Sequence, residues 1–309
     1  MGKQVLVFGI NGFVGSFLVS ELVSAGYKVI GSDLHNECAI PEVSGYCSCD
    51  LSDTRRVTSL VSEFKPDYIV NLAAISSVGQ SWRSPALTMR VNVEGALNIM
   101  EAARVQKTRV RVLLVGSSEE YAPKECPLCE GDPTVANNPY GISKATQERF
   151  AALYAEQFGL GVCLTRSFNH TGPGQNPAFV LPSWCRQAAE IERTARPGRM
   201  TVGNIDVARD FSDVRDVVHA YRLIMEGGRA GEVYNVGSGR SLPLRELLKT
   251  VKSFCPQPIE VVVDSSLIRP NDTASICCDY SKIYEELGWE PKRKIEDTLR
   301  EMYDGFVVA

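Results

Sequence analysis

Short apolar runs alternate with longer amphipathic segments through the first half of the chain. The runs KQVLVFG, KVIGSD, PDYIVNLAA and RVRVLLVGSS are short and apolar, as buried strands are. Between them the pattern predicts helices over about residues 12–25 and 85–105. Alternation of strand and helix predicts βαβ units wound into a parallel sheet, with its ligand at the carboxyl ends of the strands.

The pattern loosens after residue 165, where the glycine-, proline- and asparagine-rich segment SFNHTGPGQNP begins. A further strand-like run, GEVYNVGSG, follows, and residues 294–303 are expected to form a surface helix. The predicted fold is α/β, a doubly wound parallel sheet with a smaller C-terminal α/β lobe. The predicted boundaries are residues 1–165 with a return segment at about 209–236 for the sheet domain, and 166–208 and 237–309 for the lobe.

Length and charge narrow the classes of partner. The 309 residues allow a large buried core, and the formal net charge of −4 provides no basic field for nucleic acid. The first residues, MGKQVLVFGI, become polar and glycine-rich too early for a signal peptide. No apolar run reaches the roughly 20 residues of a membrane span. We therefore expect a cytoplasmic protein that binds neither nucleic acid nor membranes.

The ten cysteines raise the question of a metal site. The pairs Cys47 with Cys49 and Cys126 with Cys129 have a spacing that permits four thiolate ligands to zinc. The two pairs are far apart in the sequence, however, and neither has a histidine nearby. We therefore expect no metal, and reduced, partly buried thiols.

Three glycines, Gly9, Gly12 and Gly15, lie where the first predicted strand turns into the first predicted helix. Glycine lets the backbone approach a pyrophosphate, and the helix N-terminus presents N–H groups and the positive end of its dipole. Tight strand-to-helix turns also use glycine for structural reasons alone. The position of the motif at the first such turn favours dinucleotide binding.

Two aspartates that follow the next strands are candidates for further cofactor contacts. Asp33 ends KVIGSD, where a carboxylate can hydrogen-bond ribose hydroxyls and repel a 2′-phosphate. We therefore predict a preference for NAD(H) over NADP(H), with a loop or cap role for Asp33 as the alternative. Asp50, in CDLSD, is expected either to hold the adenine amino group or to cap the next helix.

Tyr140 and Lys144, in YGISK, are four residues apart and therefore share one face of a helix. A tyrosine phenol has an ordinary pKa of about 10. A lysine ammonium beside it stabilises the phenolate, so that the phenol exchanges protons near neutral pH. Such a pair occurs by chance in a chain of this size. Combined with the glycine turn and with Ser117 at the end of RVRVLLVGSS, it predicts a proton-transfer site.

These motifs, in order, resemble the extended short-chain dehydrogenase/reductase family of nucleotide-sugar enzymes. The resemblance rests on GINGFVG, NLAA, VGSSEEY, YGISK and RSFNHTGPGQ and extends over nearly the whole chain. Within the family, FVLPSWCRQ, VGNIDVARDFSDVRDVV and RPND are similar to GDP-4-keto-6-deoxy-D-mannose reductases. The resemblance implies a Rossmann domain, a sugar-nucleotide lobe, and a homodimer joined through the helices near residues 88–105 and 140–158.

The resemblance also implies roles for matching residues. Ser117 would hold the C4 oxygen of the sugar, Tyr140 would exchange a proton with it, and Lys144 would tune Tyr140 and bind the nicotinamide ribose. The implied cofactor contacts are Gly9, Asn11, Gly12, Phe13, Val14, Gly15, Asp33, Asp50, Leu51, Leu72, Ala73, Ala74, Asn92, Tyr140, Lys144, Phe168 and His170. The implied substrate contacts are Ser76, Ser77, Ser118, Glu119, Asn169, Val180, Asn204, Arg209, Asn235 and Arg269.

Several of these positions have an alternative role. Arg209 and Arg269 suit a diphosphate because of their planar guanidinium groups, but each also suits a surface salt bridge. Asn204 is a candidate contact to the base. His170 is assigned to a structural hydrogen bond beneath the nicotinamide rather than to general acid catalysis. Trp82 lies in the loop that usually lines the sugar pocket, although packing alone would also explain it.

Glu119 separates the reactions known in the family. Related 4,6-dehydratases use a carboxylate two residues after the hydroxyl residue to remove the C5 proton, and Glu119 occupies this position. Residues 168–187, however, resemble the reductases and lack the arginine-rich stretch associated with GDP-mannose dehydratases. We therefore predict reduction of the C4 ketone of GDP-4-keto-6-deoxy-D-mannose to a GDP-6-deoxyhexose. A GDP-mannose 4,6-dehydratase, a nucleotide-sugar epimerase and a non-catalytic NAD(H)-binding protein are the alternatives.

Two neighbours of Glu119 complete the prediction for this turn. Ser118 is expected to shape the turn, and Glu120 is expected to face solvent or a neighbouring loop. Ala122 departs from the glycine found in most relatives, which should alter the following loop without affecting the chemistry.

Overall fold

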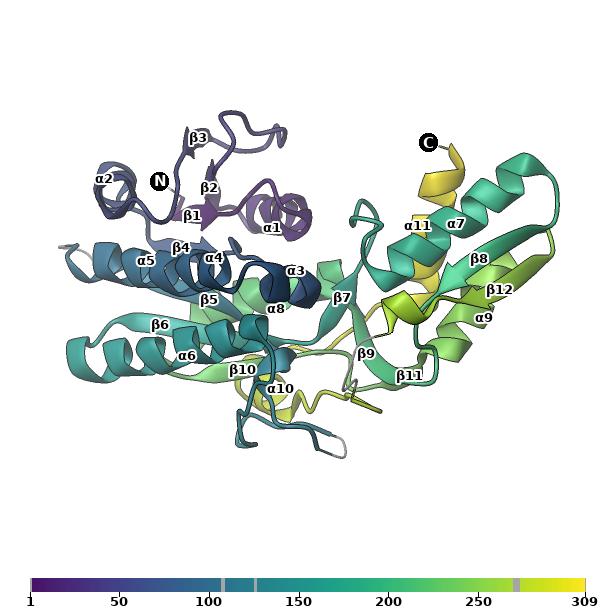
Figure 1. Ribbon diagram of the computed structural model, residues 1–309. Coiled ribbons are helices and arrows are strands. Elements are labelled where there is room, and N and C mark those ends of the chain that lie inside the picture. The colour runs from purple at the N-terminus through teal and green to yellow at the C-terminus, as the bar shows by residue number, and fades with distance from the viewer. Residues whose placement is uncertain (1, 107–108, 125–126, 269–272, 309) are drawn as a thin grey trace.

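The computed structural model describes residues 2–106, 109–124, 127–268 and 273–308. Its main body is a seven-stranded parallel sheet with the strand order β10-β6-β5-β4-β1-β2-β3 (Figure 1). The strands are β1 (Gln4–Phe8), β2 (Lys28–Asp33), β3 (Gly45–Ser48), β4 (Tyr68–Asn71), β5 (Arg111–Ser117), β6 (Gly161–Ser167) and β10 (Val233–Val236). The predicted α/β class with a parallel sheet is confirmed.

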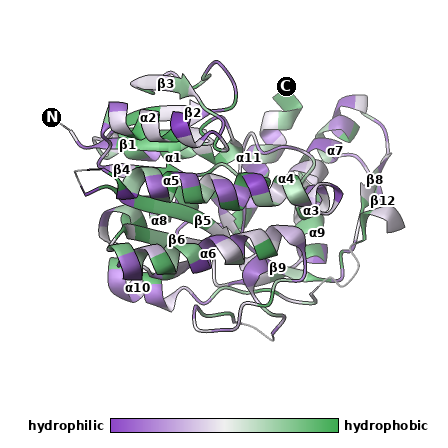
Figure 2. Cartoon of the chain, turned by 60° about the vertical axis from the view of Figure 1, so that its left-hand side comes forward, coloured by the Kyte–Doolittle hydropathy of each residue, from purple (hydrophilic) through white to green (hydrophobic). Residues whose placement is uncertain are grey.

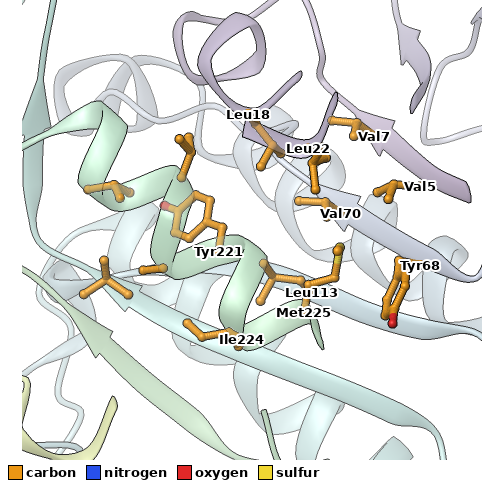
Figure 3. Packing of buried hydrophobic residues seen from close by; sticks show 14 of the residues in the cluster. Val5, Val7, Leu18, Leu22, Tyr68, Val70, Leu113, Tyr221, Ile224 and Met225 are labelled. Carbon is orange, nitrogen blue, oxygen red and sulfur yellow. The ribbon is translucent and has the colours of Figure 1, made fainter. Parts of the chain in front are cut away.

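Helices cover both faces of this sheet, and the alternation of side chains along the strands explains why. In β1, Val5 and Val7 pack on one face, whereas Leu6 and Phe8 pack on the other. The first face is covered by α1 (Phe13–Ser24) and α8 (Val214–Gly227), and the second by α2 (Thr54–Phe64), α5 (Gly95–Arg104) and α6 (Pro139–Phe158). Figure 3 shows the first core, where Leu18 and Tyr221 pack over the strands.

The helix predicted over about residues 85–105 is divided in the structure. After α3 (Val78–Arg83), the chain forms α4 (Pro85–Met89), the π-helical turn η1 (Arg90–Glu94), and then α5. A π turn inserts an extra residue into a helix and often marks a functional site. Here it places the Asn92 side chain, which is fully buried, against the loop after β4 and against α6.

The second lobe has its own core. It contains the parallel pair β8 (Gly198–Val202) and β12 (Ile259–Val263), packed with α7 (Val180–Thr194), α9 (Leu244–Phe254) and α11 (Ile295–Val308), on the right of Figure 1. The strands β11 (Ser241–Pro243), β9 (Ala208–Asp213) and β7 (Asn169–Thr171) form a second, three-stranded sheet. The prediction of a surface helix near the C-terminus was incomplete, because Leu299, Met302 and Tyr303 of α11 are buried in the lobe core.

A late segment of the chain returns to the large sheet. After the short turn η3 (Ser265–Leu267), helix α10 (Ser281–Leu287) packs against α8 and β10. Ile283 and Trp289 lie in the same core as α1 and α8, and the Trp289 indole Nε1 donates to the Asp216 carbonyl oxygen at 3.0 Å. The predicted boundary at residue 237 remains a prediction, but these residues pack on the sheet rather than in the lobe.

Apolar residues are concentrated on the central strands, between helices of mixed polarity (Figure 2). Among the residues that the structure describes, no helix combines the length and the apolar character needed to cross a membrane.

Candidate active site

The glycine turn between β1 and α1 has a geometry that only glycine satisfies. Gly9 has a φ of +76°, and a Cβ there would lie 2.5 Å from the Ala73 nitrogen. A Cβ on Gly15 would lie 1.7 Å from the Ile10 carbonyl oxygen, because the helix passes directly over the turn. The turn therefore holds β1, α1 and the end of β4 in close contact.

The N-terminus of α1 faces open space beside this turn. Its N-cap is Gly12, which has no side chain to bond the N–H groups of the first helical turn, formed by Phe13 and Val14. A cavity of about 1130 Å³ lies here, and its lining includes Asn11, Gly12, Phe13, His35, Pro173 and Asn176. A helix N-terminus without a side-chain cap, next to a cavity, fits the pyrophosphate of a dinucleotide.

Asp33 lies at the end of β2, next to the glycine turn. Its carboxylate accepts hydrogen bonds from the Asn11 N–H at 3.1 Å and the Leu34 N–H at 2.8 Å, and it contacts His35 Nδ1 at 2.9 Å. Asp33 therefore orients the glycine turn through the Asn11 N–H.

Asp50 is exposed, and its Oδ1 accepts from the Ser52 N–H at 2.8 Å. The alternative role of Asp50 as the cap of the next helix is wrong, because Asp53 caps α2 by accepting from the Arg56 N–H at 3.0 Å. The neighbouring Leu51 is buried.

The NLAA segment after β4 completes this edge of the sheet. The Asn71 Oδ1 accepts from the Ala73 N–H at 3.1 Å, and Leu72, Ala73 and Ala74 are half-buried beside Gly9. Asn92 then connects this loop to α6. Its side chain accepts from the Ile75 N–H at 2.8 Å and donates to the Ser143 Oγ at 2.9 Å.

Ser117, Tyr140 and Lys144 converge at the carboxyl end of β5. Ser117 is the last residue of β5, and Tyr140 and Lys144 lie in the first turns of α6. Burial raises the pKa of Tyr140 above its ordinary value, and a hydrogen bond with the Ser117 side chain acts in the opposite direction. Burial lowers the pKa of Lys144 to about 8, and its Nζ donates to the Val115 carbonyl oxygen at 2.6 Å. Ser117 and Lys144 are therefore buried and Tyr140 is half-buried, and all three lie at the same end of β5.

Glu119 lies beside this group, in the short 3-10 turn η2 (Ser118–Glu120) that follows β5. Its Oε2 accepts from Asn138 Nδ2 at 2.9 Å, and Asn138 also caps α6 through a bond from the Gly141 N–H to its Oδ1 at 2.9 Å. Ser118, as predicted, is part of this turn and accepts from the Tyr121 N–H at 3.2 Å through its carbonyl.

The prediction that Glu120 faces solvent or a loop is wrong. Its side chain is 0% exposed, and its Oε1 accepts from the Ser117 N–H at 2.7 Å. The 3-10 turn directs residue 120 inward, toward Glu148 of α6 and Arg166 of β6.

His170 lies in β7, with its ring 6.4 Å from the ring of Phe13 and nearly parallel to it. Its Nδ1 contacts the Phe168 carbonyl oxygen at 3.1 Å, and burial lowers the pKa of the imidazole. The hydrogen bond to the backbone carbonyl and the stacking on Phe13 fix the orientation of the His170 ring. Phe168 itself is buried and packs 6.3 Å from the Tyr121 ring.

The predicted substrate contacts occupy different environments. Ser76 and Asn169 are exposed, Ser77 caps α3 by accepting from the Gln80 N–H at 3.3 Å, and Val180 begins α7. Trp82 is 62% exposed on α3, so burial does not explain its presence.

Two other predicted contacts lie in the lobe. Arg209 donates from Nη1 to the Ala208 and Thr273 carbonyl oxygens at 2.8 and 2.7 Å. Asn204 Oδ1 accepts from the Asp206 N–H at 3.0 Å and shapes its loop. Arg269 lies outside the described residues.

Asn235 conflicts with the prediction of a substrate contact. It is 0% exposed, and its side chain bonds the Leu128 and Asp279 carbonyl oxygens and the Tyr121 hydroxyl. All of its amide groups are therefore occupied by protein groups, so it joins β10 to two neighbouring segments.

Two residues near the site were missed by the sequence analysis. Ser81, fully buried in α3, accepts from the Tyr140 N–H at 3.2 Å and so connects α3 to α6. Asn138 had a readable signal, because asparagine followed by proline is a common start of a helix. No local sequence pattern marks Ser81, because its hydrogen-bond partner, the Tyr140 N–H, lies in a different helix.

No three histidine, cysteine, aspartate or glutamate side chains gather as metal ligands in the described parts of the chain. Burial raises the pKa of the Cys49 and Cys163 thiols to about 11 and that of Cys185 to about 12. Cys126 lies outside the described residues.

Comparison with known proteins assigns the family. The family model of GDP-mannose 4,6 dehydratase matches residues 6–302. The chain belongs to this family. The family consists of extended short-chain dehydrogenases/reductases of the NAD(P)-dependent epimerase/dehydratase type, as predicted. The chain is therefore an enzyme of this nucleotide-sugar family.

Individual relatives within the family differ in activity. GDP-6-deoxy-D-mannose reductase of Pseudomonas aeruginosa is 32% identical over 97% of this chain and 96% of that protein. The structure of RMD from Pseudomonas aeruginosa complexed with NADPH has a TM-score of 0.87 and 30% identity, over 99% of both chains. UDP-glucose 4-epimerase of Thermus thermophilus, complexed with NAD, has a TM-score of 0.85 and 26% identity, over 98% of this chain and 99% of that one.

Proposed function

We propose that this enzyme reduces the C4 ketone of GDP-4-keto-6-deoxy-D-mannose to a GDP-6-deoxyhexose with a nicotinamide cofactor. The observation that carries the proposal is the placement of Ser117, Tyr140 and Lys144 at the carboxyl end of the sheet, where the glycine turn also lies. The 32% identical relative named as a reductase, covered over nearly its full length, supports this reaction among those of the family.

The residues at the sheet edge fit a nicotinamide dinucleotide. The glycine turn leaves no room for a Cβ, the N-terminus of α1 lacks a side-chain cap, and the adjacent cavity accepts a large ligand. When bound, the cofactor supplies the hydride, and the protein supplies binding, orientation and proton transfer. Lys144 would hold the nicotinamide ribose, and Asn92 would fix the loop against which the cofactor lies.

We further propose a preference for NAD(H) over NADP(H). The support is Asp33, whose carboxylate is 14% exposed at the end of β2 and would meet a 2′-phosphate with repulsion. A 30% identical relative was solved with NADPH, so the affinities of this enzyme for NADH and NADPH should be compared directly.

In the proposed reaction, the chain provides a proton to the sugar oxygen. The Ser117 hydroxyl would hold the C4 carbonyl oxygen, and the Tyr140 phenol would donate its proton to that oxygen as negative charge develops there. Lys144, one helical turn away, would stabilise the resulting phenolate as an ammonium. Arg209 and Arg269 would pair with the diphosphate, and Asn204 would contact the base.

A dehydratase is the second candidate, because one observation favours it specifically. Glu119 lies two residues after Ser117, and Asn138 fixes one of its carboxylate oxygens at 2.9 Å. A carboxylate held beside the reacting sugar could remove the C5 proton, which a C4 ketone makes acidic. In a reductase the same carboxylate would serve as a hydrogen-bond acceptor for a sugar hydroxyl.

The test offers purified enzyme two substrates separately. With GDP-4-keto-6-deoxy-D-mannose and NADH, we expect oxidation of the cofactor and formation of a GDP-6-deoxyhexose; GDP-mannose should not react. A 4-keto product formed from GDP-mannose without added reductant would contradict the proposal and support the dehydratase. The Tyr140→Phe variant should bind NADH and be inactive. This control excludes activity from a contaminating enzyme in the preparation.

We also propose that the enzyme works as a cytoplasmic homodimer, joined through α5 and α6. Ile142 and Leu153 of α6, about three turns apart and so on one face, are 46% and 49% exposed, and Leu87 of α4 is 46% exposed. Apolar side chains gathered on adjacent helices are typical of a protein interface. These helices lie toward the viewer in Figure 2.

A further inference from the structure

Glu120 forms a buried carboxyl group directly behind the active-site turn. Its Oε1 accepts from the Ser117 N–H at 2.7 Å, which fixes the peptide unit that carries the Ser117 hydroxyl. Its Oε2 is also buried, and no donor among the described residues bonds to it. A buried carboxylate oxygen without a donor is costly, so this oxygen requires an explanation.

The group opposite Glu120 is a second glutamate whose charge is already paired. Glu148, one turn after Lys144 on α6, receives two hydrogen bonds from Arg166, from Nε at 2.9 Å and from Nη2 at 2.6 Å. Arg166 is itself held by the Glu130 carbonyl oxygen and by the Tyr121 ring. The Arg166 guanidinium carries one positive charge, and that charge is already paired with the Glu148 carboxylate.

Glu120 and Glu148 both face Arg166 in the interior of the protein. Burial raises the pKa of Glu120 well above its usual range, and the charge of Glu148 and a hydrogen bond with that carboxylate add to the effect. A proton on Oε2 of Glu120 would satisfy the oxygen that lacks a donor by bonding to Glu148.

We propose that Glu120 is a positioning residue that acts as a neutral acid. Its carbonyl oxygen accepts from the Ser117 N–H, its hydroxyl donates to Glu148, and Arg166 anchors the chain of bonds. The titratable groups that face it are Tyr140, Lys144 and Glu148 from α6, and Arg166 from β6. The neutral form holds Ser117 in place without adding a negative charge near the phenol that must donate its proton.

The variants Glu120→Gln and Glu120→Ala distinguish this role from simple packing. Glutamine reproduces the neutral acid, because its amide oxygen can accept from Ser117 and its NH₂ can donate to Glu148. We expect Glu120→Gln to keep kcat within a few-fold, with an unchanged pH profile. Glu120→Ala should bind NADH normally and lose about 10²-fold in kcat at unchanged KM, as Ser117 loses its fixed position. An equal loss in both variants, or a shifted pH profile in Glu120→Gln, would overturn the proposal.

The kinetic part rests on the proposed function, so an independent measurement accompanies it. Infrared difference spectra of the wild-type and Glu120→Gln proteins at neutral pH should show a protonated carboxylic acid that is lost in the variant. Absence of that band from the wild type would overturn the proposal whatever the activity. Failure of the proposed function would instead appear as no turnover of any GDP-sugar, with the infrared band intact.

Discussion

Asn138 and Glu119 are joined by a hydrogen bond of 2.9 Å that connects the start of α6 to the turn η2. The two ends of the Asn138 amide have different tasks, since Nδ2 holds Glu119 while Oδ1 caps α6. A substitution that keeps one task and removes the other can therefore measure each separately.

Asn138→Ser and Asn138→Ala provide this pair. Serine can still cap the helix but is too short to hold Glu119, whereas alanine does neither. We expect Asn138→Ala to lose about 1 kcal/mol of unfolding free energy and Asn138→Ser to lose less. Both should lose about tenfold in kcat/KM, because the hydrogen bond that holds the Glu119 side chain in place is removed. Wild-type kinetics in Asn138→Ser would show that Glu119 does not depend on this bond.

Lys144 should leave a pH-dependent signature in stability. Its pKa is lowered from 10.5 to about 8 in the folded protein, so between these values the unfolded chain binds a proton that the folded protein does not. The folded state therefore gains stability as pH rises through this window, by up to about 3 kcal/mol relative to Lys144→Met. Urea unfolding of both proteins at pH 7.5 and above pH 9 measures the difference; a constant difference would contradict the lowered pKa.

Gly15 tests the tight contact at the glycine turn. A Cβ at residue 15 would lie 1.7 Å from a backbone oxygen that cannot move without displacing the turn, so Gly15→Ala should reduce thermal stability and abolish NADH binding. The matched control is Gly131→Ala, where no atom lies within 4 Å of the added methyl. NADH binding, measured by nicotinamide fluorescence, and the thermal unfolding temperature should be the same in the control as in the wild type. Normal NADH binding by Gly15→Ala would show that the glycine turn does not contribute to the cofactor site.

Much of the sheet edge was predictable from the sequence, because its determinants are local. The runs that became β1, β2, β4 and β5 have continuous apolar character, and the glycines at the first turn are required by contacts within a few residues. Asp33 could be placed because it ends a strand. Such features need no knowledge of distant residues.

The remaining features depend on contacts between distant residues. Glu120 looked like an exposed turn residue, and only the meeting of β5, α6 and β6 shows that it is buried beside Glu148 and Arg166. Asn235 similarly resembled a family substrate contact, but the loop near Leu128 covers it in three dimensions. The π turn at Asn92 was not visible, since its residues have the same apolar spacing as an ordinary helix.

Asp33 should control the choice of cofactor. Removing its carboxylate in Asp33→Ala takes away the ribose acceptor and the repulsion of a 2′-phosphate, so the Kd for NADH should rise about tenfold while that for NADPH stays constant or falls. Titration of both cofactors by fluorescence gives the two values. Equal losses would mean that Asp33 acts only on the turn, through its bond from the Asn11 N–H.

Leu153 should be required for self-association. A charge at this 49% exposed position of α6 would be buried without a partner in a dimer joined through this face, so Leu153→Glu should elute as a monomer in light-scattering chromatography. Val263→Glu, at a 55% exposed position of β12 in the other lobe, is the control and should keep the wild-type mass. A monomeric wild type, or a dimeric Leu153→Glu protein, would contradict the proposed interface.

The return of residues 281–289 to the large sheet has a consequence for how new specificities could arise. Ile283 and Trp289 are built into the core under α8, and α11 then re-enters the lobe core a few residues later. The lobe is therefore not encoded by one continuous segment. Any stretch of chain that contains the whole lobe also contains part of the sheet domain. A chimera that exchanged residues 237–309 for those of a relative would therefore also replace Ile283 and Trp289 in the core of the sheet domain.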